Sequence, residues 1–414
     1  MTLAPSRSGS AQDFLDDLAT VVEEVRAGAA HRDATRTYAV AEIERLRSIR
    51  FWSVSVPQEY GGLGLGPDVV VQAVLALASA DGSLGQIPQN HFMTAEQIRL
   101  GTSGEQRAHW LTELGNGAVL GNATAEPGEL PPGERATTLA RTGGRWVLDG
   151  RKVYSTGALL ADHVAVAAGT ADGPSVNVLV RPTDPGVDVQ DDWHGLGQRT
   201  TASGSSRFTG VLVEEVAVLP PVTDPVAAYR VSALGQLLHA AIDAGIAEGA
   251  FAEAVRLGHV AHGGRGSGAR RFGEDTLGVA LLGDLRVTTL AARRLVEATA
   301  ARLAALGASS PLEEVIEVFY EVAAAKLVAT RAAITVTNSL FDVGGAASTR
   351  PDLGHDRYWR DARTHTLHDA ARWKPHSIGR WILAREVADP WSIGHPLRPL
   401  DELTHPAPTD RNEP

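Results

Sequence analysis

The sequence predicts an α+β protein with a helical N-terminal domain, a central β-domain and a C-terminal helix bundle. Hydrophobic residues recur at intervals of three and four near the N-terminus and again through the last part of the chain, as they do in helices. Between these regions they alternate with polar residues among glycine, aspartate and proline, which is typical of short strands. The expected boundaries are residues 1–117, 118–222 and 223–390, and an irregular tail rich in proline and charge is expected at 391–414.

The N-terminal domain is expected to be helical from about residue 11 to residue 116. Phe14, Leu18 and Val21 share one face of the first helix, and we expect them to point into a core. The glycine-rich stretch at residues 57–66 interrupts this pattern, because glycine favours backbone angles that do not continue a helix. The stretch therefore predicts a turn before the next helix.

The central domain is expected to consist of short strands. Val176, Val178 and Val180 alternate with other residues, so that they share one face of a strand. Beyond the β-domain, long runs rich in Ala, Leu and Val return. Helices are expected at residues 277–306 and 312–341, and their lengths suit a helix bundle.

The composition excludes several classes of function. Lys and Arg number 38 against 49 Asp and Glu, and the formal net charge of −11 repels nucleic acid and anionic lipid surfaces. The chain has no cysteine, which excludes disulfides, thiolate zinc sites and cysteine nucleophiles. The apolar stretch at residues 69–80 is too short to span a membrane, and the N-terminus lacks the pattern of a secretory signal. A cytoplasmic protein that binds neither nucleic acid nor membranes is expected.

Two histidines near the end of the predicted bundle are candidates for proton transfer. His365 and His368 are three residues apart, so on a helix they share one face. Histidine is the side chain best suited to exchange a proton near neutral pH. One alternative is that His365 only forms a hydrogen bond to the backbone. Another is a metal site that includes Asp369 and His376, but no second carboxylate–histidine pair accompanies it, and no metal is expected.

Polar residues near two strand ends are candidates for ligand binding. Asn122 and Thr124 fall on one face of an expected strand, so both can reach the same ligand. The run Tyr154–Thr156 carries hydroxyl groups, and Trp193 offers a flat apolar face. From the residues alone, ordinary hydrogen bonding at strand ends and a half-buried loop anchor at Trp193 explain these features equally well.

Several motifs, taken in order, resemble the acyl-CoA dehydrogenase superfamily over nearly the whole chain. The resemblance rests on Tyr60–Leu65, on the central β-domain and on Gly344–Gly345 ahead of Arg360–Ala362. Four further segments resemble, more narrowly, the branch of sulfur-acquisition oxidoreductases and dibenzothiophene monooxygenases. They are Gln86–Phe92, Tyr154–Ala158, Asp191–Gly204 and Thr364–Asp369.

The narrower resemblance implies a two-component flavin-dependent monooxygenase. A separate flavin reductase would supply reduced FMN, and this chain would react it with O2 to form a C4a-hydroperoxyflavin. The expected substrate is a small organosulfur molecule. The superfamily resemblance also implies a homotetramer.

The resemblance further implies which residues surround the flavin. His368 is the first choice for proton exchange, His365 and His91 support it, and Thr156 would offer its hydroxyl near the reactive edge of the ring. The residues expected to bind the cofactor are Asn122, Thr124, Tyr154, Ser155, Thr156, Trp193, Gly344 and Gly345, together with the arginines discussed next.

Two departures from the family pattern leave alternatives open. The dehydrogenases carry a glutamate after the Gly-Gly pair, and this chain has none there, although Asp352 lies close to that place. An FAD-dependent acyl-CoA dehydrogenase is therefore the second hypothesis, and a flavin-free helical binding protein is the third. The arginine that meets the flavin phosphate in the monooxygenases is also missing. One alternative is that Arg265, Arg270 or Arg271 binds the flavin phosphate in its place. The other is that all three arginines are surface charges.

Overall fold

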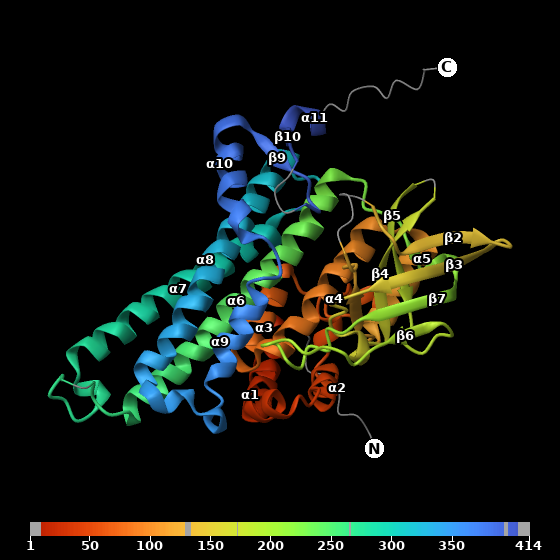
Figure 1. The fold of residues 1–414 in the computed structure, drawn as a ribbon. Helices are drawn as coiled ribbons and strands as arrows, with labels where there is room; N and C mark the ends of the chain where they lie inside the picture. The colour runs from red at the N-terminus through yellow and green to blue at the C-terminus, as the bar shows by residue number, and fades with distance from the viewer. Residues whose placement is uncertain (1–9, 129–133, 172, 265, 393–395, 405–414) are drawn as a thin grey trace.

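The computed structural model describes residues 10–128, 134–171, 173–264, 266–392 and 396–404. Figure 1 shows a long helix bundle on one side and a twisted sheet on the other, with the N-terminal helices packed against both. The described residues therefore form the helical, β and helical regions that the sequence predicts, and the predicted fold class is confirmed.

Five α-helices precede the sheet in the described part of the chain. They are α1 (Ala11–Thr35), α2 (Val40–Ser48), α3 (Pro67–Ala80), α4 (Gly82–Gly101) and α5 (Gly104–Gly115). Asp81 fixes the start of α4, because its Oδ1 accepts the backbone N–H groups of Ser83 and Leu84 at 3.0 Å each. Its Oδ2 binds the buried guanidinium of Arg32 on α1 at 2.8 Å, so one carboxylate ties two helices together.

The glycine-rich stretch forms the predicted turn between α2 and α3. A Cβ atom at Gly62 would lie 1.9 Å from the carbonyl oxygen of Val56, so only glycine fits there. Gly61 has a φ of 90°, which side chains other than hydrogen disfavour.

The β-domain is one mixed sheet. Its strands are β1 (Leu120–Ala123), β2 (Thr138–Thr142), β3 (Arg145–Lys152), β4 (His163–Thr170), β5 (Gly173–Val180), β6 (Val187–Val189), β7 (Ser206–Val213) and β8 (Val218–Leu219). The order is β6-β7-β3-β2-β4-β5-β8, and β1 pairs in parallel with β4. Apolar side chains of the sheet pack against Trp110, Leu111 and Leu114 on α5. The first strand meets the β3–β4 connection, because the backbone N–H of Asn122 donates to the oxygen of Thr156.

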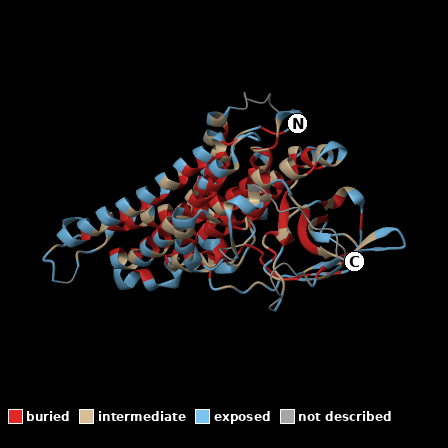
Figure 2. Ribbon diagram, turned by 90° about the horizontal axis from the view of Figure 1, so that it is seen from above, coloured by how far each residue is buried: buried red, intermediate tan, exposed pale blue. Residues whose placement is uncertain are grey.

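The C-terminal bundle is built around one long buried helix. The bundle consists of α6 (Pro225–Val260), α7 (Thr276–Ala305), α8 (Leu312–Gly344), α9 (Asp356–His365) and α10 (Lys374–Ala384). Figure 2 shows that the inner faces are buried, whereas the outer faces and the far end of the bundle are exposed. A Cβ atom at Gly245 would lie 2.4 Å from the backbone oxygen of Leu75, so α6 and α3 touch through their backbones.

The prediction of an irregular tail was wrong for part of the C-terminus. β10 (Leu397–Pro399) pairs antiparallel with β9 (Glu386–Ala388), and α11 (Leu400–Thr404) follows. The apolar side chains of Leu400 and Leu403 pack at the edge of the core, which offsets the cost of ordering this segment. No helix among the described residues is long and apolar enough to cross a membrane.

Candidate active site

The segment that connects β3 to η3 (Ala158–Leu160) is clamped between β1 and a loop of the β-domain. The backbone N–H of Asn122 donates to the oxygen of Thr156 at 3.0 Å. On the other side, the N–H of Ser155 donates to Gly204 at 2.8 Å, and that of Gly157 donates to Thr201 at 2.9 Å. Thr156 therefore occupies a position set by backbone hydrogen bonds rather than by its own side chain.

The hydroxyl group of Thr156 begins a short chain of hydrogen bonds. Its Oγ1 lies 2.8 Å from Oγ of Ser203, which lies 2.7 Å from Oγ1 of Thr201. Thr201 in turn donates to the backbone oxygen of Gln198 at 3.0 Å, and Nε1 of Trp193 donates to the same oxygen at 2.8 Å. The structure thus brings Thr156 and Trp193, two residues predicted from the sequence, to one hydrogen-bonded loop.

The remaining predicted residues of the β-domain lie around this loop. The rings of Tyr154 and Trp193 meet edge to face, with 6.1 Å between their centroids, and 61% of Tyr154 is exposed. Thr124 donates to Oδ1 of Asn122 at 2.7 Å, so these two side chains do face the same way. The Oγ of Ser155 is buried and has no hydrogen-bond partner in the structure. A flat molecule with hydrogen-bonding edges would satisfy this unpaired hydroxyl.

Helix α9 is joined directly to the same loop. Oδ1 of Asp361 accepts the backbone N–H of Gln198 at 2.5 Å, and Oγ1 of Thr364 accepts that of Gly197 at 3.0 Å. A Cβ atom at Gly197 would lie 1.9 Å from the backbone oxygen of Arg360, so the contact requires glycine. Burial raises the pKa of Asp361 to about 7, and the nearby carboxylate of Asp33 adds to the shift. The end of α9, which carries His365, is therefore held against the loop that carries Trp193.

Behind α9, His365 belongs to a buried polar cluster. Its Nδ1 lies 2.5 Å from Oδ1 of Asp243, and its Nε2 lies 3.0 Å from Nδ1 of His239. Both partners belong to α6. Lys326 on α8 donates to Oδ2 of Asp243 at 2.8 Å. The proposed alternative that His365 only bonds the backbone is excluded, because both of its ring nitrogens are used by side chains.

The charge states of this cluster follow from burial and from the ion pairs. Burial lowers the pKa of His239 and His365, so both are neutral at pH 7. Burial acts in the opposite sense on Asp243, but the charge of Lys326 and the contact with His365 outweigh it and hold the pKa of Asp243 below its ordinary value. The centroid of the His368 ring lies 3.7 Å from that of the His239 ring, and the two ring planes are tilted by 32°.

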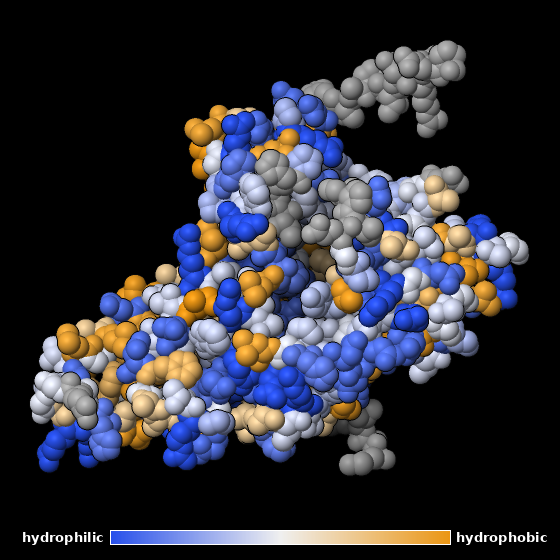
Figure 3. Space-filling view, in the orientation of Figure 1, coloured by the Kyte–Doolittle hydropathy of each residue, from blue (hydrophilic) through white to orange (hydrophobic). Residues whose placement is uncertain are grey.

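His368 is exposed in this single chain, whereas His239 and His365 are buried. Its position between the exposed surface and the buried cluster lets the ring reach both a ligand and His239. Figure 3 shows that this face of the molecule is hollowed near its centre, where the bundle meets the β-domain.

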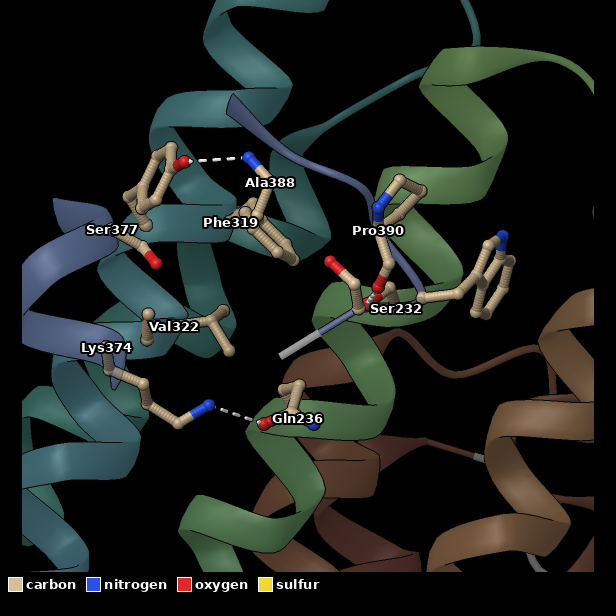
Figure 4. Close-up of a pocket in the computed structure, with 12 residues that line it drawn as sticks. Ser232, Gln236, Phe319, Val322, Lys374, Ser377, Ala388 and Pro390 are labelled. Carbon is tan, nitrogen blue, oxygen red and sulfur yellow. Dashed lines mark hydrogen bonds between the residues drawn. The ribbon is translucent and has the colours of Figure 1, made fainter. Parts of the chain in front are cut away.

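A shallow pocket, whose empty volume of about 530 Å³ includes space open to solvent, lies beyond the cluster, between α6, α8 and α10. Figure 4 shows Ser232 and Gln236 facing Lys374 across it, with Phe319 on the wall from α8. Lys374 donates to Oε1 of Gln236 at 3.0 Å and pairs with Asp369, the residue after His368, at 2.9 Å. The pocket thus combines an apolar wall with a polar floor that borders the histidines.

The prediction that His91 supports proton transfer is wrong. The residue is fully buried on α4, its Nδ1 accepts the backbone N–H of Leu120 at 3.2 Å, and its Nε2 lies 2.7 Å from the oxygen of Trp52. Because Nδ1 accepts, Nε2 carries the proton and donates, so neither nitrogen is available to a cofactor. His91 instead anchors the start of β1.

The structure does not bring the predicted phosphate-binding region to the same place. Arg265 lies outside the described residues, and Arg270 is exposed in the segment between α6 and α7. Gly344 lies close to Leu257 near the end of α6, and Gly345 follows it. His239 precedes the end of α6 by 21 residues, about 30 Å of helix. Figure 1 shows the α6–α7 connection at the end of the bundle opposite the sheet.

A nearer arginine was missed by the sequence analysis. Arg199 follows Gln198 directly, its Nε is buried without a partner, and it makes no side-chain hydrogen bond or ion pair among the described residues. The sequence offers only the weak signal of an arginine within the Asp191–Gly204 motif.

His239, Asp243 and Lys326 were also missed. The signal that was available is polarity within apolar helices: His239 and Asp243 are four residues apart on α6, and Lys326 follows three alanines on α8. Ionisable residues rarely occupy such positions unless they are paired with one another. No group of three histidine, aspartate or glutamate side chains in the described ranges is arranged to hold a metal ion.

Comparisons with known proteins agree with this architecture. The N-terminal, middle and C-terminal domain models of acyl-CoA dehydrogenase match residues 10–118, 108–211 and 237–373, respectively. Dibenzothiophene monooxygenase from Rhodococcus qingshengii is 31% identical over 406 residues, which cover 92% of this chain and 97% of that protein. The probable FMNH2-dependent monooxygenase SfnC from Pseudomonas putida is 30% identical, with coverage of 83% and 88%.

A solved structure extends the likeness to three dimensions. The crystal structure of FMN-bound TdsC from Paenibacillus sp. A11-2 superposes with a TM-score of 0.85 at 29% identity, and the match covers 91% of this chain and 99% of that one. Sequence and structure together show that the chain belongs to the acyl-CoA dehydrogenase family, in its branch of flavin-dependent monooxygenases.

Proposed function

We propose that this protein uses reduced FMN, supplied by a separate flavin reductase, and O2 to oxygenate a small organosulfur molecule. One oxygen atom would enter the substrate and the other would leave as water, while the reduced flavin is oxidised. The relatives support this proposal, since one is named for dibenzothiophene, another for FMNH2, and a third was solved with FMN. The C4a-hydroperoxyflavin that the resemblance implies stays a prediction, as does the cytoplasmic location.

The observation that carries the proposal is the bonded path between the histidines and Thr156. Asp361 and Thr364 of α9 hold Gly197 and Gln198, and the hydroxyl chain continues from Gln198 to Thr156. Residues of the β-domain and of α9 therefore meet at one junction. A site of this kind can orient a ring and exclude water from it.

The residues at the junction fit an isoalloxazine ring. Ser155 offers a buried hydroxyl without a partner, Thr156 offers a second hydroxyl, and the aromatic pair of Tyr154 and Trp193 offers a flat boundary. Asn122 adds an amide on the same side as Thr124. When bound in its reduced form, FMN supplies the electrons for oxygen activation, and these side chains would bind and orient it.

The pocket between α6, α8 and α10 is our candidate for the substrate. Its wall is apolar and aromatic, and Gln236 and Lys374 form its polar floor. Such a cavity suits a molecule with an apolar body and a small polar group, as an organosulfur compound and its oxidised product have. Trp391, which is 52% exposed, stands at its rim.

The phosphate of FMN has two candidate partners, one from the same copy of the chain and one from a second copy. Arg199 lies beside the hydroxyl chain in the same copy, whereas Arg270 would have to come from a second copy in the expected homotetramer. Substituting each arginine by glutamine separates these cases, if binding of FMN is compared with that of riboflavin. Loss of the preference for FMN identifies the arginine that meets the phosphate.

The function is tested by supplying the purified protein with chemically reduced FMN, ¹⁸O2 and dibenzothiophene as a probe, and by mass spectrometry of the products. We expect one ¹⁸O atom in the oxygenated sulfur compound and a clear excess over the reaction without protein. Oxidation of the flavin to yield only hydrogen peroxide, with this and other small organosulfur probes, would contradict the proposal.

A further inference from the structure

The buried cluster behind the candidate site forms a hydrogen-bonded series in which the proton positions can be derived. Asp243 accepts from Lys326 at 2.8 Å and from Oγ1 of Thr330 at 2.7 Å through Oδ2. Its Oδ1 lies 2.5 Å from Nδ1 of His365. An ionised carboxylate can only accept hydrogen bonds, so Nδ1 of His365 carries the proton.

The same reasoning extends one step further, to His239. A neutral imidazole with its proton on Nδ1 has a free lone pair on Nε2, so Nε2 of His365 accepts from Nδ1 of His239 at 3.0 Å. Nε2 of His239 is then unprotonated, and no hydrogen bond to this atom is found in the described part of the chain. The centroid of this ring lies 3.7 Å from that of His368, which is exposed.

We propose that His239 is a positioning residue of the oxygenation, which accepts a proton at Nε2 beside His368 and relays it to the Asp243–His365 pair. The inference rests on the proposed function. In the relay, a proton binds Nε2 of His239 and the proton on its Nδ1 moves to Nε2 of His365. His365 becomes an imidazolium held by the carboxylate of Asp243. The series gains one proton, no electron is transferred, and the reverse sequence returns the proton.

Burial, rather than the net charge around the series, prevents the two histidines from keeping that proton at rest. Lys326 from α8 and Lys374 from α10 oppose an additional positive charge. Asp243 from α6 and Asp369 from the segment after α9 favour it. Together with the neighbouring His368, these are the ionisable groups that face the two buried histidines. The two lysines and two aspartates balance, so the cluster is neutral before the proton arrives.

The proton positions are measurable without any flavin. ¹⁵N spectra of histidine-labelled protein, assigned with His239→Gln and His365→Gln variants, report which ring nitrogen carries hydrogen. We expect both buried histidines to be protonated on Nδ1 and free on Nε2. Protonation of His365 on Nε2 would overturn the relay, because the series would then run in the opposite direction.

Two variants that remove charges of opposite sign near His365 distinguish a proton relay from a structural role. Lys326→Met removes a repulsive charge, so the acid limb of the pH–rate profile moves to higher pH, whereas Asp243→Asn moves it to lower pH, by about one unit each. Thr330→Val, a milder change, moves it upward by less and serves if the others fold poorly. Movement in the same direction for Lys326→Met and Asp243→Asn would refute the relay.

The control for these variants is a buried lysine elsewhere. Lys152 pairs with Glu126 in the β-domain, and its side chain is completely buried. Lys152→Met should reduce the midpoint temperature of unfolding as Lys326→Met does. We expect no change in the histidine titrations of this control.

The last arm of the test follows the product. His239→Gln should lower the yield of oxygenated probe per reduced FMN by about 100-fold at pH 7, while the Kd for reduced FMN changes by less than about threefold. An unchanged yield, or a loss of reduced-FMN binding, would contradict the assignment. If even the unaltered protein oxygenates no probe, the proposed function fails, and the ¹⁵N spectra still decide the proton positions.

Discussion

At the scale of single residues, the surroundings of a histidine decide whether its ring nitrogens are available for chemistry. His365 and His368 come from a segment that lies against both α6 and the β-domain loop, and both rings lie close to that of His239. His91 has the same side chain, but it lies in a helix that is buried on nearly all sides. The sequence shows that a histidine is present, but it does not show whether its nitrogens are already occupied.

His91 is expected to matter for stability rather than for chemistry. His91→Leu leaves two buried backbone groups unpaired, and we expect a loss of about 2–4 kcal/mol in the free energy of unfolding at pH 7.5. Burial lowers the pKa of His91 to about 4, so its contribution is complete above pH 6.5 and declines as the pH falls toward 4. Denaturant titrations should therefore show a smaller difference between the two proteins at pH 5. An equal difference at both pH values would contradict this account.

Ser155 is expected to show the reverse behaviour. Removing a buried hydroxyl that has no partner costs nothing, so Ser155→Ala should keep or raise the midpoint temperature of unfolding. If the hydroxyl serves FMN, the same change weakens FMN binding by about 2- to 10-fold, measured by fluorescence titration. Ser206→Ala is the matched control, because Ser206 is also buried and unpaired but lies in β7. Equal effects of both variants on FMN affinity would argue against the site.

At the scale of elements, periodicity predicted the helices and strands well, because each of them buries one face or its whole circumference. Residues 277–306 and 312–341 are expected helices, and the structure has α7 at Thr276–Ala305 and α8 at Leu312–Gly344. What periodicity could not predict is how α9 meets the loop at Gly197. That contact depends on a close backbone approach and on hydrogen bonds between residues more than 160 positions apart.

The joint between α9 and the loop is expected to make stability depend on pH through Asp361. In the folded protein its pKa is about 7, above the ordinary value of 3.8. Between these two pH values the folded state therefore binds more protons than the unfolded state. This contribution therefore falls as the pH rises from about 4 to about 7, by up to about 4 kcal/mol. Asp361→Asn keeps an oxygen for Gln198 but does not ionise. We expect the melting temperature of the variant, relative to that of the unaltered protein, to rise between pH 5 and pH 8. If the difference in melting temperature is the same at both pH values, the pKa assigned to Asp361 is wrong.

At the scale of the whole molecule, the predicted cofactor residues fall into two groups that one copy does not bring together. One group surrounds Thr156, and the other, with Arg270 and Gly344–Gly345, lies toward the far end of α6. A homotetramer, which stays a prediction, would resolve this separation if the far end of one copy reaches the junction of another. The sequence could not reveal the separation, because it follows from the length of α6.

The outer face of α7 is the candidate surface for such an assembly. Val287 is 68% exposed, and Val279 and Leu290 lie on the same side of the helix. A combined Val287→Asp and Leu290→Asp change should convert the assembly to smaller species in light scattering and weaken FMN binding. Val40→Asp, at an exposed apolar position on α2, should leave the mass unchanged. An unaltered mass for the α7 variant would exclude this face.

The roles proposed for the side chains at the junction depend on where the flavin ring lies. A crystal structure of the protein with FMN tests this most directly. We expect the flavin ring between Ser155 and Thr156 on one side and the exposed His368 on the other, with Trp193 beside it. A ring bound away from this junction, or one that contacts neither hydroxyl nor imidazole, would contradict the central claim.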